Sequence, residues 1–361
     1  MDNTPLGSAD PELRKALTQR LHRRAVVTGE MTVPAVPGML DEYVEMCTDT
    51  FAALGVHFAE VEITHLRSVL EGQLAEAYAA SPRSNIVISY QSPVGSTISY
   101  NVVPQWSSLE SAYDNWVATR EPPYFGTEPD ARVSALAAEA ADPAAFPILD
   151  IGAGTGRNSL ALARRGHPVD AVEMSPRFAE IILTEAQREG LNVRVTLRDV
   201  FTTTSDLRRD YQLILLSEVV SDFRSTDQLA AVFTLAAECL APGGRLVFNI
   251  FLARDGYEPD EAARQLGEQC YTSIFTYPEL AQASAMVPLE LVADDSVYDY
   301  EMTHLAPESW PPTSWYAEWV SGQDVFAVPR EQCPIEMRWL VYRKADWIMT
   351  RSGGGNSPTE W

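Results

Sequence analysis

The spacing of apolar and polar positions divides the chain into two parts with different rhythms. In the first part, apolar residues recur at helical intervals over 40–54 and 66–78, and then alternate with polar residues over 85–90 and 97–103. Helical intervals place apolar side chains on one face of a helix, and alternation places them on one face of a strand. Residues 1–105 therefore predict a small module of helices and a β-hairpin.

After Pro147 the rhythm changes to short apolar runs that alternate with helical patterns. Such alternation is typical of right-handed βαβ units, which assemble their strands into a mostly parallel sheet. The expected strands cover 147–152, 168–174, 193–199, 212–218, 244–252, 289–301 and 335–343, and the expected helices cover 156–166, 176–189, 226–240 and 277–285.

These two rhythms imply two folded parts and a tail, in a chain of 361 residues that is long enough for both. We expect an N-terminal module over 1–128, which we interpret as a cap on a substrate site, and a second domain over 129–350. Residues 351–361 begin with a stretch rich in Gly and Ser, a composition typical of a flexible tail.

The formal net charge of −23 argues against nucleic acid as a partner, because a phosphate-binding surface needs a basic footprint. No apolar run approaches the roughly eighteen residues of a membrane span, so no membrane partner is expected either. We interpret the basic residues near the N-terminus as the solvated face of a short helix: Arg14, Lys15, Arg20, Arg23 and Arg24.

The cysteines are far apart in the sequence, at Cys47, Cys239, Cys270 and Cys333. Without a C-x-x-C spacing, neither a zinc site nor a disulfide framework is indicated, and we expect no metal. The N-terminus is polar and acidic, unlike a signal peptide. These features favour a cytoplasmic protein with reduced thiols.

The most specific motif joins an apolar run to a glycine-rich turn and a helical pattern. Leu149–Gly156 reads L-D-I-G-A-G-T-G, and the helical pattern follows at once. A strand, a tight glycine turn and a helix N-terminus form a cradle for a nucleotide-like cofactor. A dinucleotide fingerprint, G-x-G-x-x-G, would need a glycine where this chain has Arg157, which argues against an NAD-dependent oxidoreductase.

Three further motifs follow in order: Val169–Ser175, Leu197–Phe201 and Leu240–Phe248, at the ends of the second and third strands of this part and at the turn into the fifth. With all four motifs in register, residues 130–345 resemble the class I S-adenosylmethionine-dependent methyltransferases, of a small-molecule type with an N-terminal helix-plus-hairpin extension. The resemblance implies an α/β fold with a doubly wound, mostly parallel, seven-stranded Rossmann-like sheet. It also implies S-adenosyl-L-methionine as the cofactor.

The resemblance assigns cofactor contacts to the glycine loop and to the residues around it. Gly152 and Gly154 would let the backbone approach the methionine part of the cofactor, and Gly156 would let the helix pack close to the strand. The other residues expected to contact the cofactor are Asp150, Ala153, Glu173, Met174, Asp199, Val200, Phe201, Ser217 and Tyr124.

Three of these residues are acidic, and each has a simpler alternative role. Glu173 would accept both ribose hydroxyls in a bidentate pair, or would be an exposed charge at a strand end. Asp199 would bind the adenine amino group, or would be a helix cap or a loop charge. Asp150 would meet the cofactor's ammonium group, or would only anchor the loop.

The residues that follow the strand over 212–218 are expected to face the methyl group. Ligands of this fold meet the carboxyl ends of the strands, at the point where the strand order reverses. We therefore expect Glu218 and Asp222 to act as catalytic groups. His304 is the third candidate, because it is the only histidine in a plausible substrate segment. A general base is needed only if the nucleophile loses a proton as it reacts.

Two long insertions accompany this core. The segment 296–334 is rich in Trp and Tyr, and it either clasps the sheet or N-terminal module or forms a wall of the substrate site. The segment 254–275 follows the fifth strand and is expected to act as a lid.

Together these observations predict an enzyme that moves a methyl group to an oxygen or nitrogen of a small-molecule acceptor, in specialised metabolism. One alternative is a peptide or protein side-chain methyltransferase, whose cleft the N-terminal module would shape. Another is a non-catalytic partner protein that binds the cofactor. The sequence leaves the acceptor and the oligomeric state open.

Overall fold

The computed structural model describes residues 10–22, 24, 26–92, 97–107, 117–119, 121–202 and 206–345. The chain forms two compact units: Met1–Glu121 with Glu258–Thr272, and Pro122–Tyr257 with Ser273–Trp361. The expected boundary lay between residues 128 and 129, whereas the first unit ends at Glu121 and also includes the internal segment Glu258–Thr272. The expected tail, 351–361, lies outside the described residues.

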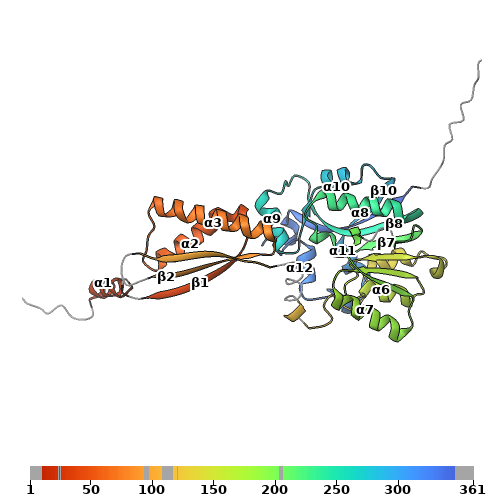
Figure 1. Cartoon of the computed structure of the whole chain (residues 1–361), viewed down its shortest axis with the longest axis horizontal. Helices are drawn as coiled ribbons and strands as arrows, with labels where there is room; N and C mark the ends of the chain where they lie inside the picture. The colour runs from red at the N-terminus through yellow and green to blue at the C-terminus, as the bar shows by residue number, and fades with distance from the viewer. Residues whose placement is uncertain are drawn as a thin grey trace, which may run out of the picture. The chain divides into compact units, whose positions relative to one another are not determined.

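The first unit packs helices on a three-stranded antiparallel sheet of order β1-β2-β3 (Figure 1). Its elements are α1 (Pro11–His22), β1 (Val27–Pro34), α2 (Leu40–Ala53), α3 (Glu60–Ala80), β2 (Asn85–Ser92) and β3 (Ser99–Gln105). The expected helices and hairpin strands are present. The strand β1 was not expected, although its polar Thr28, Glu30 and Thr32 alternate with half-buried positions; this alternation was overlooked.

An internal helix, α9 (Glu261–Gln269), belongs to this first unit. Its Gln265 side chain accepts a hydrogen bond from the Gly38 amide at 2.7 Å, and its neighbour Glu268 accepts one from the Tyr78 hydroxyl at 2.9 Å. Leu266 packs against the unit's buried cluster. The segment expected as a lid is thus, over 258–272, a structural part of the first unit.

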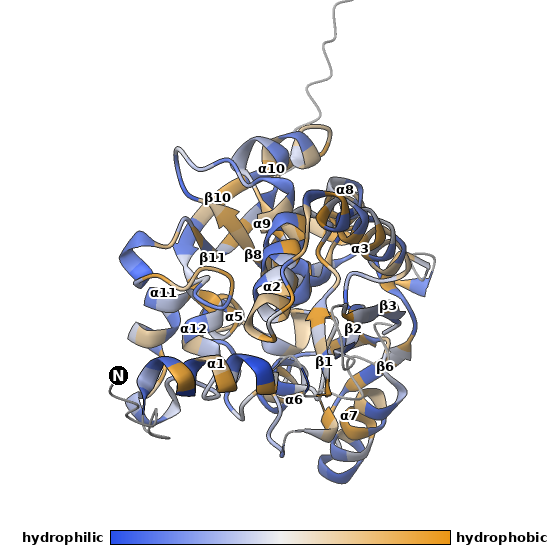
Figure 2. Ribbon diagram, turned by 90° about the vertical axis from the view of Figure 1, so that its left-hand side faces the viewer, coloured by the Kyte–Doolittle hydropathy of each residue, from blue (hydrophilic) through white to orange (hydrophobic). Residues whose placement is uncertain are grey.

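The helix α1 carries alternating apolar and polar bands, visible in Figure 2. Its basic residues Arg14, Lys15 and Arg20 are exposed, as expected for a solvated face. Leu17 and Leu21 are exposed as well. No helix among the described residues is long and apolar enough to cross a membrane.

The second unit is a doubly wound sheet of order β10-β11-β8-β7-β4-β5-β6, with the short β9 paired to β8. The strands are β4 (Ile148–Ile151), β5 (Val169–Glu173), β6 (Val193–Leu197), β7 (Tyr211–Leu216), β8 (Leu240–Ala253), β9 (Ile274–Phe275), β10 (Leu289–Ser296) and β11 (Ile335–Lys344). Only β11 runs antiparallel to its two neighbours. The seven expected strands are confirmed, and β9 is an addition to them.

Helices cover both faces of this sheet (Figure 1). The helices α8 (Thr226–Cys239) and α10 (Tyr277–Ser284) bury apolar residues against β7, β8 and β11 on one face. The helices α6 (Arg157–Arg164) and α7 (Pro176–Glu189) cover β5 on the other face. The remaining helices of this unit are α5 (Ala131–Ala137), α11 (Val297–His304) and α12 (Tyr316–Val320).

The expected strand over 289–301 is wrong beyond Ser296, where α11 begins. The Ser296 hydroxyl accepts a hydrogen bond from the Asp299 amide at 3.4 Å, which caps the new helix. The residues at 297, 298 and 300 are apolar or aromatic, as is typical of a strand, and the helix cap at Ser296 was overlooked. As a result Glu301 and His304 lie on a helix.

Gly156→Ala tests the need for glycine at the start of α6. Gly156 has a φ of 86°, and an added Cβ would lie 3.0 Å from a side-chain atom of Ile182. We expect the free energy of unfolding to fall by about 2–4 kcal/mol, from backbone strain and overpacking together. Denaturant unfolding of the free protein measures it.

Gly190→Ala is the matched control, because Gly190 has a φ of 67° and no atom would lie within 4 Å of its added Cβ. It should lose only the backbone contribution of about 1–2 kcal/mol. Equal losses in the two variants would contradict a packing role for Gly156.

Candidate functional site

The glycine loop after β4 is held in a backbone conformation that favours glycine. Gly152, Gly154 and Gly156 have φ values of 69°, 56° and 86°. An added Cβ at Gly152 would lie 2.4 Å from a Val219 methyl group, so the loop also packs closely against the segment after β7. The expected role of Gly156 in close packing is confirmed by its approach to Ile182 on α7.

The carboxylate of Glu173, at the end of β5, fixes this loop. Its Oε2 accepts a hydrogen bond from the Gly154 amide at 2.7 Å, and its Oε1 accepts one from the Ser175 amide at 2.7 Å. The side chain is buried, and burial raises the pKa of Glu173. The alternative of an exposed strand-end charge is therefore wrong.

Asp150 is buried under the same loop. Its Oδ2 accepts a hydrogen bond from the Ser159 hydroxyl at 2.6 Å, which joins the end of β4 to α6. Burial raises the pKa of Asp150 to about 7, with Asp130 and Glu173 contributing further repulsion. This geometry favours the role of loop anchor over a direct contact with an ammonium group.

The guanidinium of Arg157, the first residue of α6, is buried between two carboxylates. Its Nη1 lies 2.6 Å from Asp130 Oδ1, and its Nη2 lies 2.8 Å from Glu218 Oε1. Since Asp130 precedes α5 and Glu218 follows β7, one cation joins three segments. The negative charges of both partners oppose the effect of burial and keep the pKa of Arg157 above its ordinary value.

The carboxylate of Asp130 binds several polar side chains. Besides Arg157, its carboxylate accepts hydrogen bonds from Asn158 Nδ2 at 2.8 Å and from the Ser217 hydroxyl at 2.6 Å. Its backbone amide donates to Asn158 Oδ1 at 3.0 Å. The expected cofactor residue Ser217 is thus fixed beside the start of α6.

Glu218 has the most unusual environment of the expected catalytic residues. Its φ of 61° is uncommon for a residue with a side chain and marks local backbone strain. Its amide donates to Asn249 Oδ1 on β8 at 2.7 Å. Burial raises the pKa of Glu218 to about 7, with the Asp130 charge adding to it and Arg157 opposing it. Asp222, four residues later, is partly exposed in the 3₁₀ turn Val220–Asp222.

The aromatic insertion over 296–334 contributes two buried polar residues to this region. Glu301 accepts hydrogen bonds from the amides of Ala131 and Arg132 and from Trp339 Nε1, and so holds the start of α5. Burial, with repulsion from Asp130, raises the pKa of Glu301 to about 7.

Tyr316 is buried among the tryptophans of the same insertion. Its ring lies 5.8 Å from that of Trp310 and 6.3 Å from that of Trp319, and the Trp319 ring lies 5.5 Å from that of Phe251 on β8. The insertion therefore clasps the sheet through a packed aromatic cluster, as one of the two expectations had it.

The remaining expected cofactor residues lie around the ends of β4, β5 and β6. Ala153 and Val200 are buried, and Met174 is exposed. The exposed Asp199 accepts a hydrogen bond from the Phe201 amide at 2.9 Å, a capping interaction of its own turn. Phe201 packs against the core, with its ring 6.0 Å from Phe223. Their roles toward a cofactor stay predictions.

Two expected residues lie apart from the Arg157 cluster. Tyr124 is buried beside Phe178, and its hydroxyl accepts a hydrogen bond from Arg177 at 3.0 Å. The aromatic ring nearest an added Cβ at Gly154 belongs to Phe125 instead, at 3.5 Å. His304 is exposed on α11, where its ring stacks on Tyr300. The catalytic role of His304 has no support from this position.

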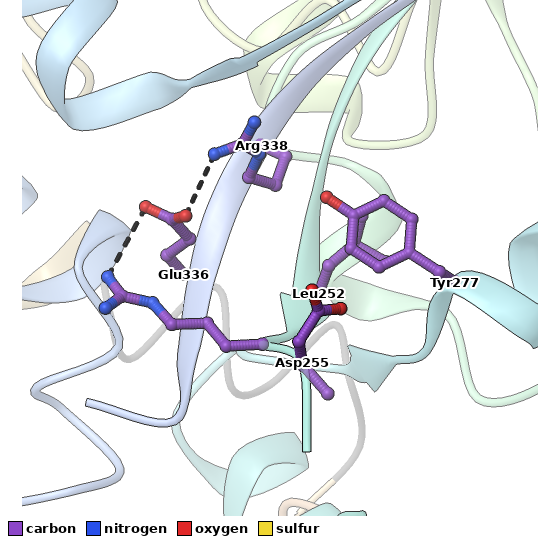
Figure 3. A pocket seen from close by; sticks show the side chains of 7 residues that line it. Leu252, Asp255, Tyr277, Glu336 and Arg338 are labelled. Carbon is purple, nitrogen blue, oxygen red and sulfur yellow. Dashed lines mark hydrogen bonds and ion pairs between the residues drawn. The ribbon is translucent and has the colours of Figure 1, made fainter. Parts of the chain in front are cut away.

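A cavity of about 410 Å³ opens at the carboxyl end of β8 (Figure 3). Arg338 lies on its wall, paired with Asp294 at 2.7 Å and with Glu336 at 2.9 Å. The cavity is lined by Leu252, Ala253, Arg254, Asp255, Tyr277, Glu336 and Arg338. Because β8 is parallel to β7, this cavity and Glu218 lie at the same edge of the sheet.

The site contains residues that sequence reasoning missed. Arg157 was used only as an argument against a dinucleotide, and Asp130 was not singled out. An arginine at the start of a helix whose N-terminus favours negative charge was a usable signal that it has acidic partners. No sequence spacing indicated that Glu301, Asn249 or Tyr316 belong to the site, because they come from distant parts of the chain.

Part of the second unit is similar in sequence to known methyltransferases. Residues 148–244 match the sequence model of a methyltransferase domain. A ubiquinone biosynthesis O-methyltransferase from Coxiella burnetii is 28% identical over 102 residues, which are 28% of this chain and 42% of that protein. A demethylmenaquinone methyltransferase from Tropheryma whipplei is 33% identical over 102 residues, 28% of this chain and 39% of that protein. The chain thus spans about two fifths of the length of these relatives.

Among solved structures, the chain is similar to a geranyl diphosphate C-methyltransferase from Streptomyces coelicolor. The two are 15% identical with a TM-score of 0.47, and the match covers 60% of this chain and 80% of that chain.

The raised pKa values of Asp150, Glu218 and Glu301 predict that stability falls as pH rises. Each carboxyl titrates at about 7 in the folded protein and at roughly 4 in an unfolded chain. Between these values the folded state binds more protons. The stabilisation is therefore complete below pH about 4 and lost as the pH rises through about 7. Thermal unfolding between about pH 5 and 8 measures it.

Glu218→Gln should show a shallower loss of stability with pH, because the amide does not titrate. Glu308→Gln is the control, since Glu308 is exposed on a 3₁₀ turn, and it should keep the slope of the parent protein. A Glu218→Gln variant with the parent slope would show that Glu218 titrates normally.

Proposed function

Because residues 148–244 form a methyltransferase domain of the class I, S-adenosylmethionine-dependent type, we propose that the protein moves a methyl group from this cofactor to an oxygen or nitrogen of a small-molecule acceptor. One observation carries the proposal: the glycine loop of this domain is held by the buried Glu173 carboxylate at its Gly154 amide. The quinone-related names of the two relatives support a small molecule as acceptor.

The residues around the glycine loop fit the cofactor. A carboxylate offers about four lone-pair positions, of which Glu173 uses two for the Gly154 and Ser175 amides. The remaining positions would accept the two ribose hydroxyls. Gly154, without a side chain, would border the methionine part, and Asp199 and Val200 would border the adenine.

When bound, S-adenosylmethionine supplies a methyl group on a positively charged sulfur, which an in-line nucleophile displaces. The protein's part in such a reaction is mainly to position the nucleophile and to remove its proton. Glu218 is suited to remove the proton, since it lies at the carboxyl end of β7 and its pKa of about 7 lets it change protonation near neutral pH. Arg157 fixes the orientation of its carboxylate.

The acceptor site would lie at the carboxyl ends of β7 and β8. It would lie beside Glu218, on the face of β8 that carries Asn249. The cavity of about 410 Å³ borders Leu252 and Arg338, on the opposite face of the sheet, and would not hold the reacting group.

The setting that we propose is cytoplasmic, as the composition suggested. All four cysteines are free thiols, three of them buried and Cys270 half-buried. Free thiols are typical of a reducing compartment.

Glu173→Ala tests the cofactor assignment. We expect the affinity for S-adenosylmethionine to fall by about ten- to one-hundredfold, which corresponds to roughly 1.5–3 kcal/mol for hydrogen bonds to a charged group. Isothermal titration calorimetry measures it, and the parent protein should show no comparable binding of NAD.

Glu180→Ala is the control, because Glu180 is exposed on α7 and its loss changes the net charge equally. It should bind the cofactor as the parent protein does. Preference for NAD, or full affinity in Glu173→Ala, would refute the assignment.

A further inference from the structure

Two buried polar groups near Glu218 have no hydrogen-bond partner among the described residues. One is the amide nitrogen Nδ2 of Asn249, whose Oδ1 holds the Glu218 amide at 2.7 Å. The other is the hydroxyl of Tyr316. Both residues are only 1% exposed. Buried polar groups nearly always have partners, so two such groups beside one strained residue indicate a place for a ligand.

Both groups are hydrogen-bond donors. The amide nitrogen of Asn249 can only donate. Burial, with the negative charges of Asp130, Glu218 and Glu301, raises the pKa of Tyr316 well above its ordinary value, so the phenol keeps its proton. The Tyr316 ring lies 6.3 Å from that of Trp319, whose ring lies 5.5 Å from that of Phe251, so the phenol lies on the face of β8 that also carries Asn249.

Glu218 supplies the complementary group, a proton acceptor. Arg157 binds Oε1 of Glu218 at 2.8 Å, and Oε2 is the second oxygen of the same carboxylate. The site thus offers two donors and one base, all within the second unit.

We propose that the nucleophile of the acceptor is a hydroxyl oxygen, which Asn249 and Tyr316 hold by hydrogen bonds and Glu218 deprotonates. The inference rests on the proposed function and narrows it from oxygen or nitrogen to oxygen. Once its proton has moved to Glu218, the oxygen has three lone pairs, so one can attack the methyl carbon while the other two accept the hydrogen bonds of Asn249 and Tyr316. A neutral amine nitrogen has one lone pair, which must attack, and would leave both donors unpaired.

The bond changes in this step balance. An oxygen lone pair forms the new O–CH₃ bond, and the bond between methyl carbon and sulfur breaks with its electron pair remaining on sulfur. The hydroxyl proton moves to the Glu218 carboxylate, which later releases it to water. The products are a methyl ether, a neutral thioether and one proton.

Tyr316→Phe tests the assignment with pairs of probe acceptors that differ only in a hydroxyl or an amino group, such as phenol with aniline and benzyl alcohol with benzylamine. With labelled S-adenosylmethionine, we expect the parent protein to methylate hydroxyl members. The variant should do so about tenfold more slowly, the effect of one neutral hydrogen bond. Asn249→Asp keeps the acceptor for the Glu218 amide, loses the donor, and should slow transfer similarly. Methylation of the amino members alone would overturn the proposal.

Cofactor binding separates this inference from the proposed function. Tyr316→Phe should bind S-adenosylmethionine with the parent affinity. Weaker binding in the variant would assign the hydroxyl to the cofactor and overturn the inference, while the proposed function would stand. A parent protein that does not bind S-adenosylmethionine would refute the proposed function itself.

The stability of the free protein gives a readout that needs no acceptor. Removing an unpartnered hydroxyl should leave the unfolding temperature of Tyr316→Phe unchanged or raise it. The control is Tyr211→Phe, since the Tyr211 ring is equally buried but its hydroxyl bonds to Asp170. This control should unfold at a lower temperature. A matching drop in Tyr316→Phe would give that hydroxyl a structural partner and overturn the proposal.

Discussion

The buried ion pairs of Arg157 are the interaction on which the rest of the site depends. A guanidinium in this position is costly to bury, and the carboxylates of Asp130 and Glu218 compensate for it, together with the Glu128 carbonyl at 3.3 Å. Breaking a buried pair of this kind costs about 3–5 kcal/mol, because a charge is left without a partner. The start of α6, the approach to α5 and the end of β7 are therefore fixed together.

The same pair gives Glu218 its chemical character. An unpaired carboxyl at this depth would remain protonated far above neutral pH, and an exposed one would ionise at roughly 4. Burial and the Asp130 charge on one side, and Arg157 on the other, leave its pKa at about 7. The strained φ of 61° is maintained by the bond from its amide to Asn249. Position and acidity thus depend on residues from four separate segments.

The sequence was informative where local chemistry decides the structure. The glycines at 152, 154 and 156 have positive φ values, which glycine adopts readily, and Glu173 ends a short, mostly apolar strand. Both could be placed without knowledge of the tertiary fold. A mostly parallel sheet could be inferred as well, since alternating strands and helices permit few topologies.

Sequence reasoning failed where distant segments meet. Glu301 was expected on a strand. Its role at the start of α5 depends on α11, whose beginning is marked in the sequence by the cap residue Ser296. Asn249 is one polar residue in a buried apolar strand, and Tyr316 is one aromatic residue among many. Asn249 and Tyr316 come near Glu218 through tertiary packing, which leaves no repeating pattern in the sequence.

The return of residues 258–272 to the first unit has a consequence for synthesis on the ribosome. Gly38 and Tyr78 find their partners Gln265 and Glu268 only after most of the chain has been made. The N-terminal unit therefore leaves the ribosome first but completes its core late, after the glycine loop and the first five strands of the second unit have emerged.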